Sequence, residues 1–146
     1  MKKYISIRLV LSLLIGSAYF QSVLAQSPAI EGYSPVSYFT KHVAERGSPD
    51  FQVKHEGKIY YVSSLEQLTI FNENPDMYAP KFGDYCPYSL ILGRELPIDP
   101  TSFKVIGNSL LLFHKSEQLD ARTEWNKGKD EDQLEEATGV FVLLSF

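Results

Sequence analysis

The chain has 146 residues, of which 44% are apolar and 13% aromatic. This length suits one domain with its own packed core, and the composition argues against a disordered chain. The formal net charge of −4 disfavours nucleic acid and other polyphosphates as partners, because they require clustered Lys and Arg.

Residues 1–25 have the pattern of a cleavable export signal. Two lysines precede an apolar run over residues 5–20, and the segment ends in Val23-Leu24-Ala25, with small residues where signal peptidase reads. The alternative is an uncleaved membrane anchor, which the short run, Arg8 and the cleavage-like end disfavour. We therefore expect an exported bacterial protein, periplasmic or secreted, with no membrane span in residues 26–146.

The predicted mature chain is acidic and has a single thiol. Cleavage removes three basic residues and no acidic one, so 11 basic and 18 acidic residues give a charge of −7. Cys86 is the only cysteine, so no disulfide forms within the chain although export would permit one. A lone thiol of this kind is buried and inert, joined to another chain, or kept as a ligand or redox group.

The first predicted elements of the mature chain are a helix and a hairpin. Ser34 stands as an N-cap before a proline, which predicts a short helix over residues 34–40. Apolar and polar residues then alternate over residues 51–55, and Glu56-Gly57-Lys58 turns the chain into Ile59-Tyr60-Tyr61-Val62. This alternation predicts a β-hairpin over residues 51–62, with one face in the core.

A second helix and an irregular segment follow. Ser64 and Gln67 form a capping-box pattern, and apolar residues recur after it at helical spacing, so residues 64–74 are predicted to form an amphipathic helix. Residues 75–88 are dense in Pro, Gly and aromatic residues without regular spacing, which predicts a structured loop. This loop is expected to enter a short helix over residues 86–92, closed by a glycine.

The last part of the chain is predicted to hold another hairpin and helices. Residues 103–113 read as a hairpin in which Gly107-Asn108 supplies the positive φ of a two-residue turn. A serine is the predicted cap of a helix over residues 117–126. The charged residues 127–136 are predicted to be helical and solvated, whereas the apolar tail, residues 139–146, has no usable periodicity.

Several landmarks resemble the YHS-domain family. They are Tyr60-Tyr61-Val62-Ser63-Ser64, Phe71 and Asn74-Pro75-Asp76-Met77-Tyr78. The opening Gly32-Tyr33-Ser34-Pro35-Val36-Ser37-Tyr38-Phe39 and the segment Phe82-Gly83-Asp84-Tyr85-Cys86-Pro87-Tyr88 resemble an exported bacterial subfamily with Gly-Tyr-Asp-Pro-Val-Ala-Tyr-Phe and Tyr-Gly-Gly-Tyr-Cys-Ala-Tyr there. With the landmarks up to Trp125, the resemblance covers roughly two thirds of the chain.

The resemblance implies an α+β fold in a single domain over residues 26–146. A small YHS/TRASH-like ββα module would span residues 32–92. A second β-hairpin and C-terminal helices would span residues 93–138, followed by the tail at residues 139–146.

Metal binding in typical YHS modules depends on cysteines at the ends of the ββα unit. In this chain the usual cysteine positions fall on Ser37, Ser63 and Gln67. Neutral hydroxyls and an amide are poor ligands for zinc or copper. The resemblance therefore implies the fold without its usual metal site.

Cys86 is the leading functional candidate in the sequence. It lies between Tyr85 and Tyr88 at the start of a predicted helix, where the helix dipole favours a thiolate. We expect a soft metal ion, copper(I) first, or a small ligand to bind near this thiol. Tyr61, Tyr85 and Tyr88 are the expected ligand contacts, and His114 is the candidate second metal ligand.

Three classes of function follow in order. The first is a non-enzymatic binding module for a metal ion or small ligand near Cys86. The second is a structural or protein-interaction domain in which Cys86 is buried and inert, since free cysteine is among the most buried residue types. An enzyme comes third, because a Cys86–His114 pair has no identifiable orienting Asn or Asp.

Overall fold

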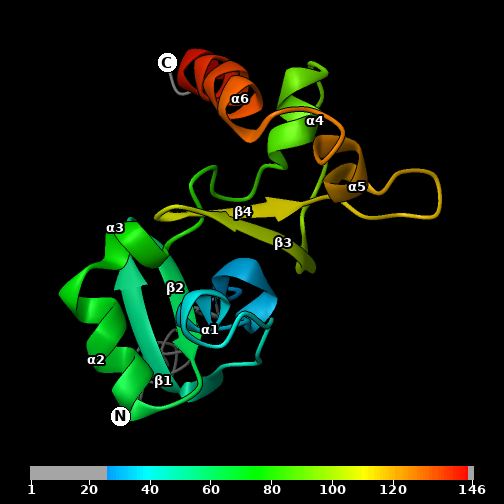
Figure 1. The fold of residues 1–146 in the computed structure, drawn as a ribbon. Coiled ribbons are helices and arrows are strands. Elements are labelled where there is room, and N and C mark those ends of the chain that lie inside the picture. The colour runs from blue at the N-terminus through cyan, green and yellow to red at the C-terminus, as the bar shows by residue number, and fades with distance from the viewer. Residues whose placement is uncertain (1–25, 145–146) are drawn as a thin grey trace, which may run out of the picture.

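Two antiparallel β-hairpins organise the chain, and helices cover each of them (Figure 1). The structure is a computed structural model that describes residues 26–144. The first hairpin pairs β1 (Ser48–His55) with β2 (Lys58–Val62), and the second pairs β3 (Asp99–Ile106) with β4 (Ser109–Phe113). The predicted α+β fold is confirmed.

The first hairpin turns tightly at two residues. Glu56 and Gly57 have φ angles of 47° and 75°, and two successive positive φ angles characterise the type I′ turn, whose twist suits a hairpin. His55 pairs with Lys58 across the turn. Lys58 is therefore the first residue of β2. The prediction that placed it in the turn with Glu56 and Gly57 is wrong.

Three helices lie around the first hairpin. After a 3-10 turn, η2 (Ala29–Gly32), come α1 (Pro35–Thr40), α2 (Leu65–Glu73) and the one-turn α3 (Pro75–Tyr78). The predicted cap of α2 is confirmed, since the Gln67 amide donates to Ser64 Oγ at 3.2 Å. Ser34 is the N-cap residue of α1, as predicted, although its Oγ makes no capping hydrogen bond and donates to Gln67 Oε1 at 2.6 Å instead.

The C-terminal helices are α4 (Pro87–Ile91), α5 (Ala121–Trp125) and α6 (Asp130–Leu144). Helix α5 begins later than predicted because Asp120 caps it, accepting from the Thr123 amide at 3.0 Å. The predicted cap, Ser116, accepts from the Leu119 amide at 3.2 Å within a turn.

The predicted boundary between helix and tail at residue 139 is wrong for the described residues. Helix α6 continues without a break to Leu144. The periodic signal is lost because apolar residues lie on both faces of the last turns: Phe141 is half-buried, whereas Val142 and Leu143 are exposed. A helix with apolar residues all round has no stripe that a periodicity can detect.

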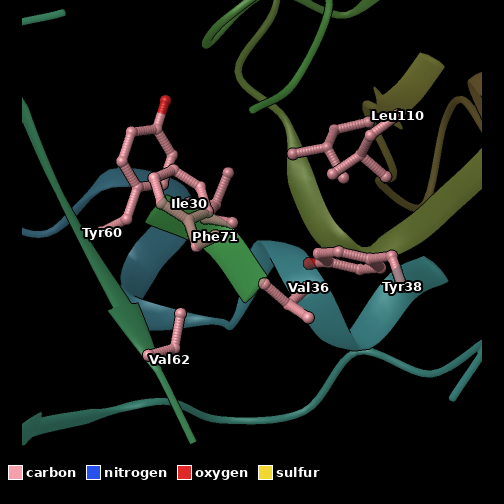
Figure 2. Packing of buried hydrophobic residues seen from close by; sticks show 8 residues of the cluster. Ile30, Val36, Tyr38, Tyr60, Val62, Phe71 and Leu110 are labelled. Atoms are coloured by element: carbon pink, nitrogen blue, oxygen red, sulfur yellow. The ribbon is translucent and has the colours of Figure 1, made fainter. Parts of the chain in front are cut away.

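Strand β4 lies between two hydrophobic cores and contributes to both. Leu110 and Leu112 belong to the N-terminal core, whose other buried members are Ile30, Val36, Tyr38, Tyr60, Val62 and Phe71 (Figure 2). Leu111 and Phe113 belong to the C-terminal core, whose other buried members are Phe82, Cys86, Leu90, Ala121, Trp125 and Ala137. Successive side chains of a strand point to opposite faces, so a strand buried on both faces reads as a continuous apolar run.

None of the helices within residues 26–144 is long and apolar enough to cross a membrane. The predicted export signal, residues 1–25, lies outside the described residues.

Candidate functional site

The Cys86 sulfur lies inside the C-terminal core. Cys86 precedes the five-residue helix α4, and its side chain is 0% exposed. Its carbonyl accepts from Ser89 Oγ at 2.8 Å and from the Leu90 amide at 3.1 Å, which begins the helix. Since Phe82 and Trp125 pack in the same cluster, a ligand reaches the sulfur only if this core opens.

The candidate metal ligand His114 follows β4 and is half-buried. Its Nδ1 lies 2.8 Å from the carbonyl oxygen of Pro97, so Nδ1 carries the proton and Nε2 is the nitrogen left for a ligand. Within residues 26–144, no group of three close His, Cys, Asp or Glu donors includes Cys86 or His114. The structure thus brings no third donor to the predicted pair.

The three candidate tyrosines lie in different surroundings. Tyr85 is half-buried and lines a surface pocket, and its ring centroid lies 6.1 Å from that of Phe141. Tyr88 packs against the C-terminal core. Tyr61 lies on β2, where its neighbour Tyr60 faces the same pocket as Tyr85.

Strand alternation explains why Tyr60 and not Tyr61 belongs to the pocket. Tyr60 is buried against Phe71, with ring centroids 5.3 Å apart, and Figure 2 shows its hydroxyl pointing away from the other labelled side chains. The next residue in a strand points to the opposite face. The sequence motif contains both tyrosines, and only the burial of one face distinguishes them.

The pocket beside Tyr85 has a volume of about 410 Å³ and aromatic walls. We call it the Tyr60–Tyr85 pocket. Its aromatic residues come from three separate parts of the chain: Tyr60, Phe82, Tyr85 and Phe141. Its charged residues are balanced, two acidic and two basic: Glu56, Asp84, Lys58 and Lys81. Pockets for small molecules typically have this size and combine apolar walls with a few polar groups.

An ion pair joins the two sides of the pocket. Lys58 Nζ on β2 lies 2.6 Å from Asp84 Oδ2 on the segment that precedes α4. A Cβ at Gly83 would lie 3.3 Å from Lys58 Nζ and would crowd the pair slightly, and the φ of +57° at Gly83 also favours glycine there. The same pair borders a second hollow of about 430 Å³ beside η2.

The segment 80–85 is held in place by backbone contacts. Pro80 bridges to Leu110 of β4, and the Lys81 amide donates to the Leu110 carbonyl at 2.9 Å. At the other end, Tyr85 forms a bridge with Pro97. Hydrogen bonds on both sides fix this wall of the pocket relative to the second hairpin.

Tyr60 offers the pocket a hydroxyl that stays protonated. Burial, with smaller contributions from the nearby carboxylates of Asp84 and Glu56, raises the pKa of Tyr60 to about 12. At neutral pH the Tyr60 hydroxyl is therefore a hydrogen-bond donor and acceptor.

A second polar feature joins Ser37, Ser63 and Gln67. Ser63 Oγ and Gln67 Nε2 both donate to Glu45 Oε2, at 2.9 and 3.1 Å. The Glu45 amide donates to Ser37 Oγ at 3.2 Å. Ser37, Ser63 and Gln67 thus converge on one glutamate, although they lie on three different segments.

Comparisons with models of protein families, with curated proteins and with solved structures find no match for this chain.

Proposed function

We propose that the chain is an exported, non-enzymatic binding domain that holds a small ligand in the Tyr60–Tyr85 pocket. The observation that carries the proposal is the gathering of four aromatic rings around balanced charges in a pocket of about 410 Å³. Tyr85, one residue before the lone cysteine, was predicted as a ligand contact. The cysteine itself supports the pocket wall from the core side.

The chemistry of the pocket favours a ligand with an apolar or aromatic body and no net charge. Its lysines and carboxylates cancel, so a strongly charged molecule gains little from the local field. Aromatic rings offer faces and edges to a planar ligand, and the Tyr60 hydroxyl supplies an oriented polar contact. A zwitterion such as an amino acid also fits, because the Lys58–Asp84 pair offers both signs.

Ligand mapping by NMR tests the pocket. We expect small neutral and zwitterionic aromatic compounds, added to the purified protein, to shift the signals of Tyr60 and Tyr85 together. The variant Tyr85→Ala should weaken the binding by about tenfold, a loss typical of an aromatic contact residue. Tyr88→Ala is the matched control and should bind as the unaltered protein does. Shifts that are absent, or equal binding by both variants, would refute the pocket.

Soft-metal binding at Cys86, with His114 as a second ligand and copper(I) as the first candidate, stays a prediction. The buried sulfur supports it only if the C-terminal core opens to admit the ion. Anaerobic competition titration with copper(I) tests it: Cys86→Ser and His114→Ala should each lose the metal. Binding by either variant as tight as that of the unaltered protein would reject it.

The alternative function is a structural or protein-interaction domain in which Cys86 is inert. The complete burial of Cys86 favours this alternative over chemistry at the thiol. In that case thiol reagents should modify Cys86 only after the protein unfolds. Rapid modification of the folded protein would count against it.

Membership of the YHS family and export belong to the same proposal. The convergence of Ser37, Ser63 and Gln67 on Glu45 supports the resemblance, because a shared metal site requires its ligand positions to meet in space.

For export, the mass of the protein recovered from the periplasm or medium should correspond to a chain that begins at Gln26. An uncleaved chain in the cytoplasm would contradict it.

A further inference from the structure

One group of metal-ligating side chains lies outside the residues that the sequence suggested. His55, Glu56 and Asp76 hold their ligand atoms within 4.8 Å of one another. The closest pair is His55 Nε2 and Asp76 Oδ1, at 3.0 Å. His55 ends β1, Glu56 begins the hairpin turn and Asp76 lies in the first turn of α3, so the group forms where these three elements meet.

The imidazole in this group is held in position. The His55 side chain is 16% exposed, and its ring meets Phe71 edge to face at 6.1 Å between centroids. Its Nε2 is therefore directed toward the carboxylate of Asp76, which is 84% exposed and accessible from solvent. The contact therefore places an imidazole nitrogen and a carboxylate oxygen, both possible metal ligands, side by side at the surface.

From this geometry we propose that His55, Glu56 and Asp76 bind a divalent transition-metal ion such as Zn²⁺. Imidazole nitrogen and carboxylate oxygens are common ligands of zinc, and two carboxylates neutralise the charge of the ion. Ligand atoms that each lie about 2.1 Å from one ion are roughly 3.0 to 3.5 Å apart, and the His55–Asp76 distance falls in this range. The Glu56 carboxylate lies within 4.8 Å of the other two ligand atoms and moves closer when the ion binds. The absence of sulfur from this set favours Zn²⁺ over copper(I).

The surroundings leave room for further ligands. The group lines a polar pocket of about 310 Å³, which Asn108 and Ser109 of the second hairpin also line. Water or these polar side chains complete the coordination shell. Lys81 lines the same pocket, and its positive charge opposes the ion, so the carboxylates must outweigh it. Without an ion, the His55–Asp76 contact is a simple ion pair on the surface, and this is the competing explanation of the geometry.

This ion site goes beyond the proposed ligand pocket and is separable from it. Glu56 and Lys81 border both pockets, whereas His55 and Asp76 border only the polar one and Tyr85 only the aromatic one. An ion at Glu56 therefore lies at the edge of the ligand pocket. Loss of ligand binding in Tyr85→Ala and loss of ion binding in Asp76→Asn are independent outcomes.

Calorimetric titration of the untagged protein with Zn²⁺ tests the site. We expect one ion per chain, and a loss of affinity of at least tenfold in both His55→Ala and Asp76→Asn, since even groups that only orient a ligand cost about 10 to 100-fold. Asp76 is mostly exposed, so Asp76→Asn should fold normally. A second readout is the visible absorption of bound Co²⁺, which should be present in the unaltered protein and absent in both variants.

Matched controls separate this site from unspecific binding. Asp50→Asn removes an exposed carboxylate at the far end of β1, and His114→Ala removes the histidine that the sequence suggested; both should bind Zn²⁺ as the unaltered protein does. The proposal is overturned if the unaltered protein binds no Zn²⁺ at millimolar concentration. It is equally overturned if Asp76→Asn binds as tightly as Asp50→Asn.

Discussion

Glu45 is the residue on which the polar network near α1 and α2 depends. One of its carboxylate oxygens accepts from Ser63 and Gln67, and the other lies 2.6 Å from Lys41 Nζ. The hydrogen bond from Lys41 lowers the pKa of Glu45 most, and those from Ser63 and Gln67 add to it, against a smaller effect of burial. A carboxylate with these partners stabilises the fold while it is ionised.

The lowered pKa gives a pH dependence with a definite sign. The contribution of Glu45 to the free energy of unfolding is fully present above its ordinary pKa of 4.5 and is lost as the pH falls through the lowered value. We therefore expect Glu45→Gln to be less stable than the unaltered protein at pH 7, and the difference to shrink as the pH falls below 4.5 and through the lowered pKa of Glu45. Urea unfolding of both proteins between pH 7 and pH 3 measures it.

The matched control for Glu45 is Glu66→Gln, which alters an exposed glutamate in the first turn of α2. Its effect on stability should be small at every pH. If Glu45→Gln instead shows the same deficit at pH 7 and pH 3, the deficit comes from hydrogen bonds that the amide nitrogen cannot accept and not from the lost charge.

At the scale of elements, local signals in the sequence predict most of what the structure shows in its first half. The alternation around Glu56-Gly57 and the cap at Ser64 act over a few residues, so the hairpin and α2 follow from them. The start of α5 was predicted too early because Ser116 and Asp120 are equally good N-cap residues by type. Only the backbone path of the connection after β4 decides between them.

The candidate site is less predictable because its residues meet only through packing. Tyr85 was predicted as a ligand contact because it precedes Cys86 in the sequence, and the structure places it in the wall of the Tyr60–Tyr85 pocket. Lys58 and Phe141 enter the same pocket from β2 and α6, 83 positions apart in the numbering of the chain. No local pattern relates such positions. The group His55, Glu56 and Asp76 was missed for the same reason, although its first two members are adjacent.

Helix α6 provides a prediction at this scale. Phe141 lies in the segment with no usable periodicity, yet its ring packs edge to face with Phe82 at 5.5 Å between centroids. Because Phe141 is half-buried, Phe141→Ala should lower the free energy of unfolding by about 2 kcal/mol, less than the loss for a fully buried ring. It should also weaken ligand binding in the Tyr60–Tyr85 pocket. Chemical unfolding and the NMR titration above measure the two effects.

Leu143→Ala is the control within the same helix. Leu143 is 78% exposed, and substitutions at such positions usually change stability by less than about 0.5 kcal/mol. Equal losses for Phe141→Ala and Leu143→Ala would show that α6 contributes through its helical structure alone and not through the packing of Phe141.

At the scale of the whole molecule, the second hairpin connects two halves that have separate cores. In Figure 1 it lies between the first hairpin with its helices and the group formed by α4, α5 and α6. The four residues from Leu110 to Phe113 are all buried. Each half therefore loses one wall of its core if β4 detaches, which couples the aromatic segment 82–88 to the N-terminal ββα unit.

This coupling predicts that the two cores unfold together. Leu110→Ala opens a cavity in the N-terminal core and Leu111→Ala opens one in the C-terminal core, and each should cost about 2 to 5 kcal/mol. Trp125, the only tryptophan of the chain, reports on the C-terminal core by fluorescence, and amide hydrogen exchange of β2 reports on the N-terminal core. If β4 transmits the loss, Leu110→Ala shifts the Trp125 transition as far as it shifts exchange in β2. A strand shared between two cooperative cores cannot be weakened on one face alone. If Leu110→Ala leaves the Trp125 transition unchanged, the two halves therefore fold independently.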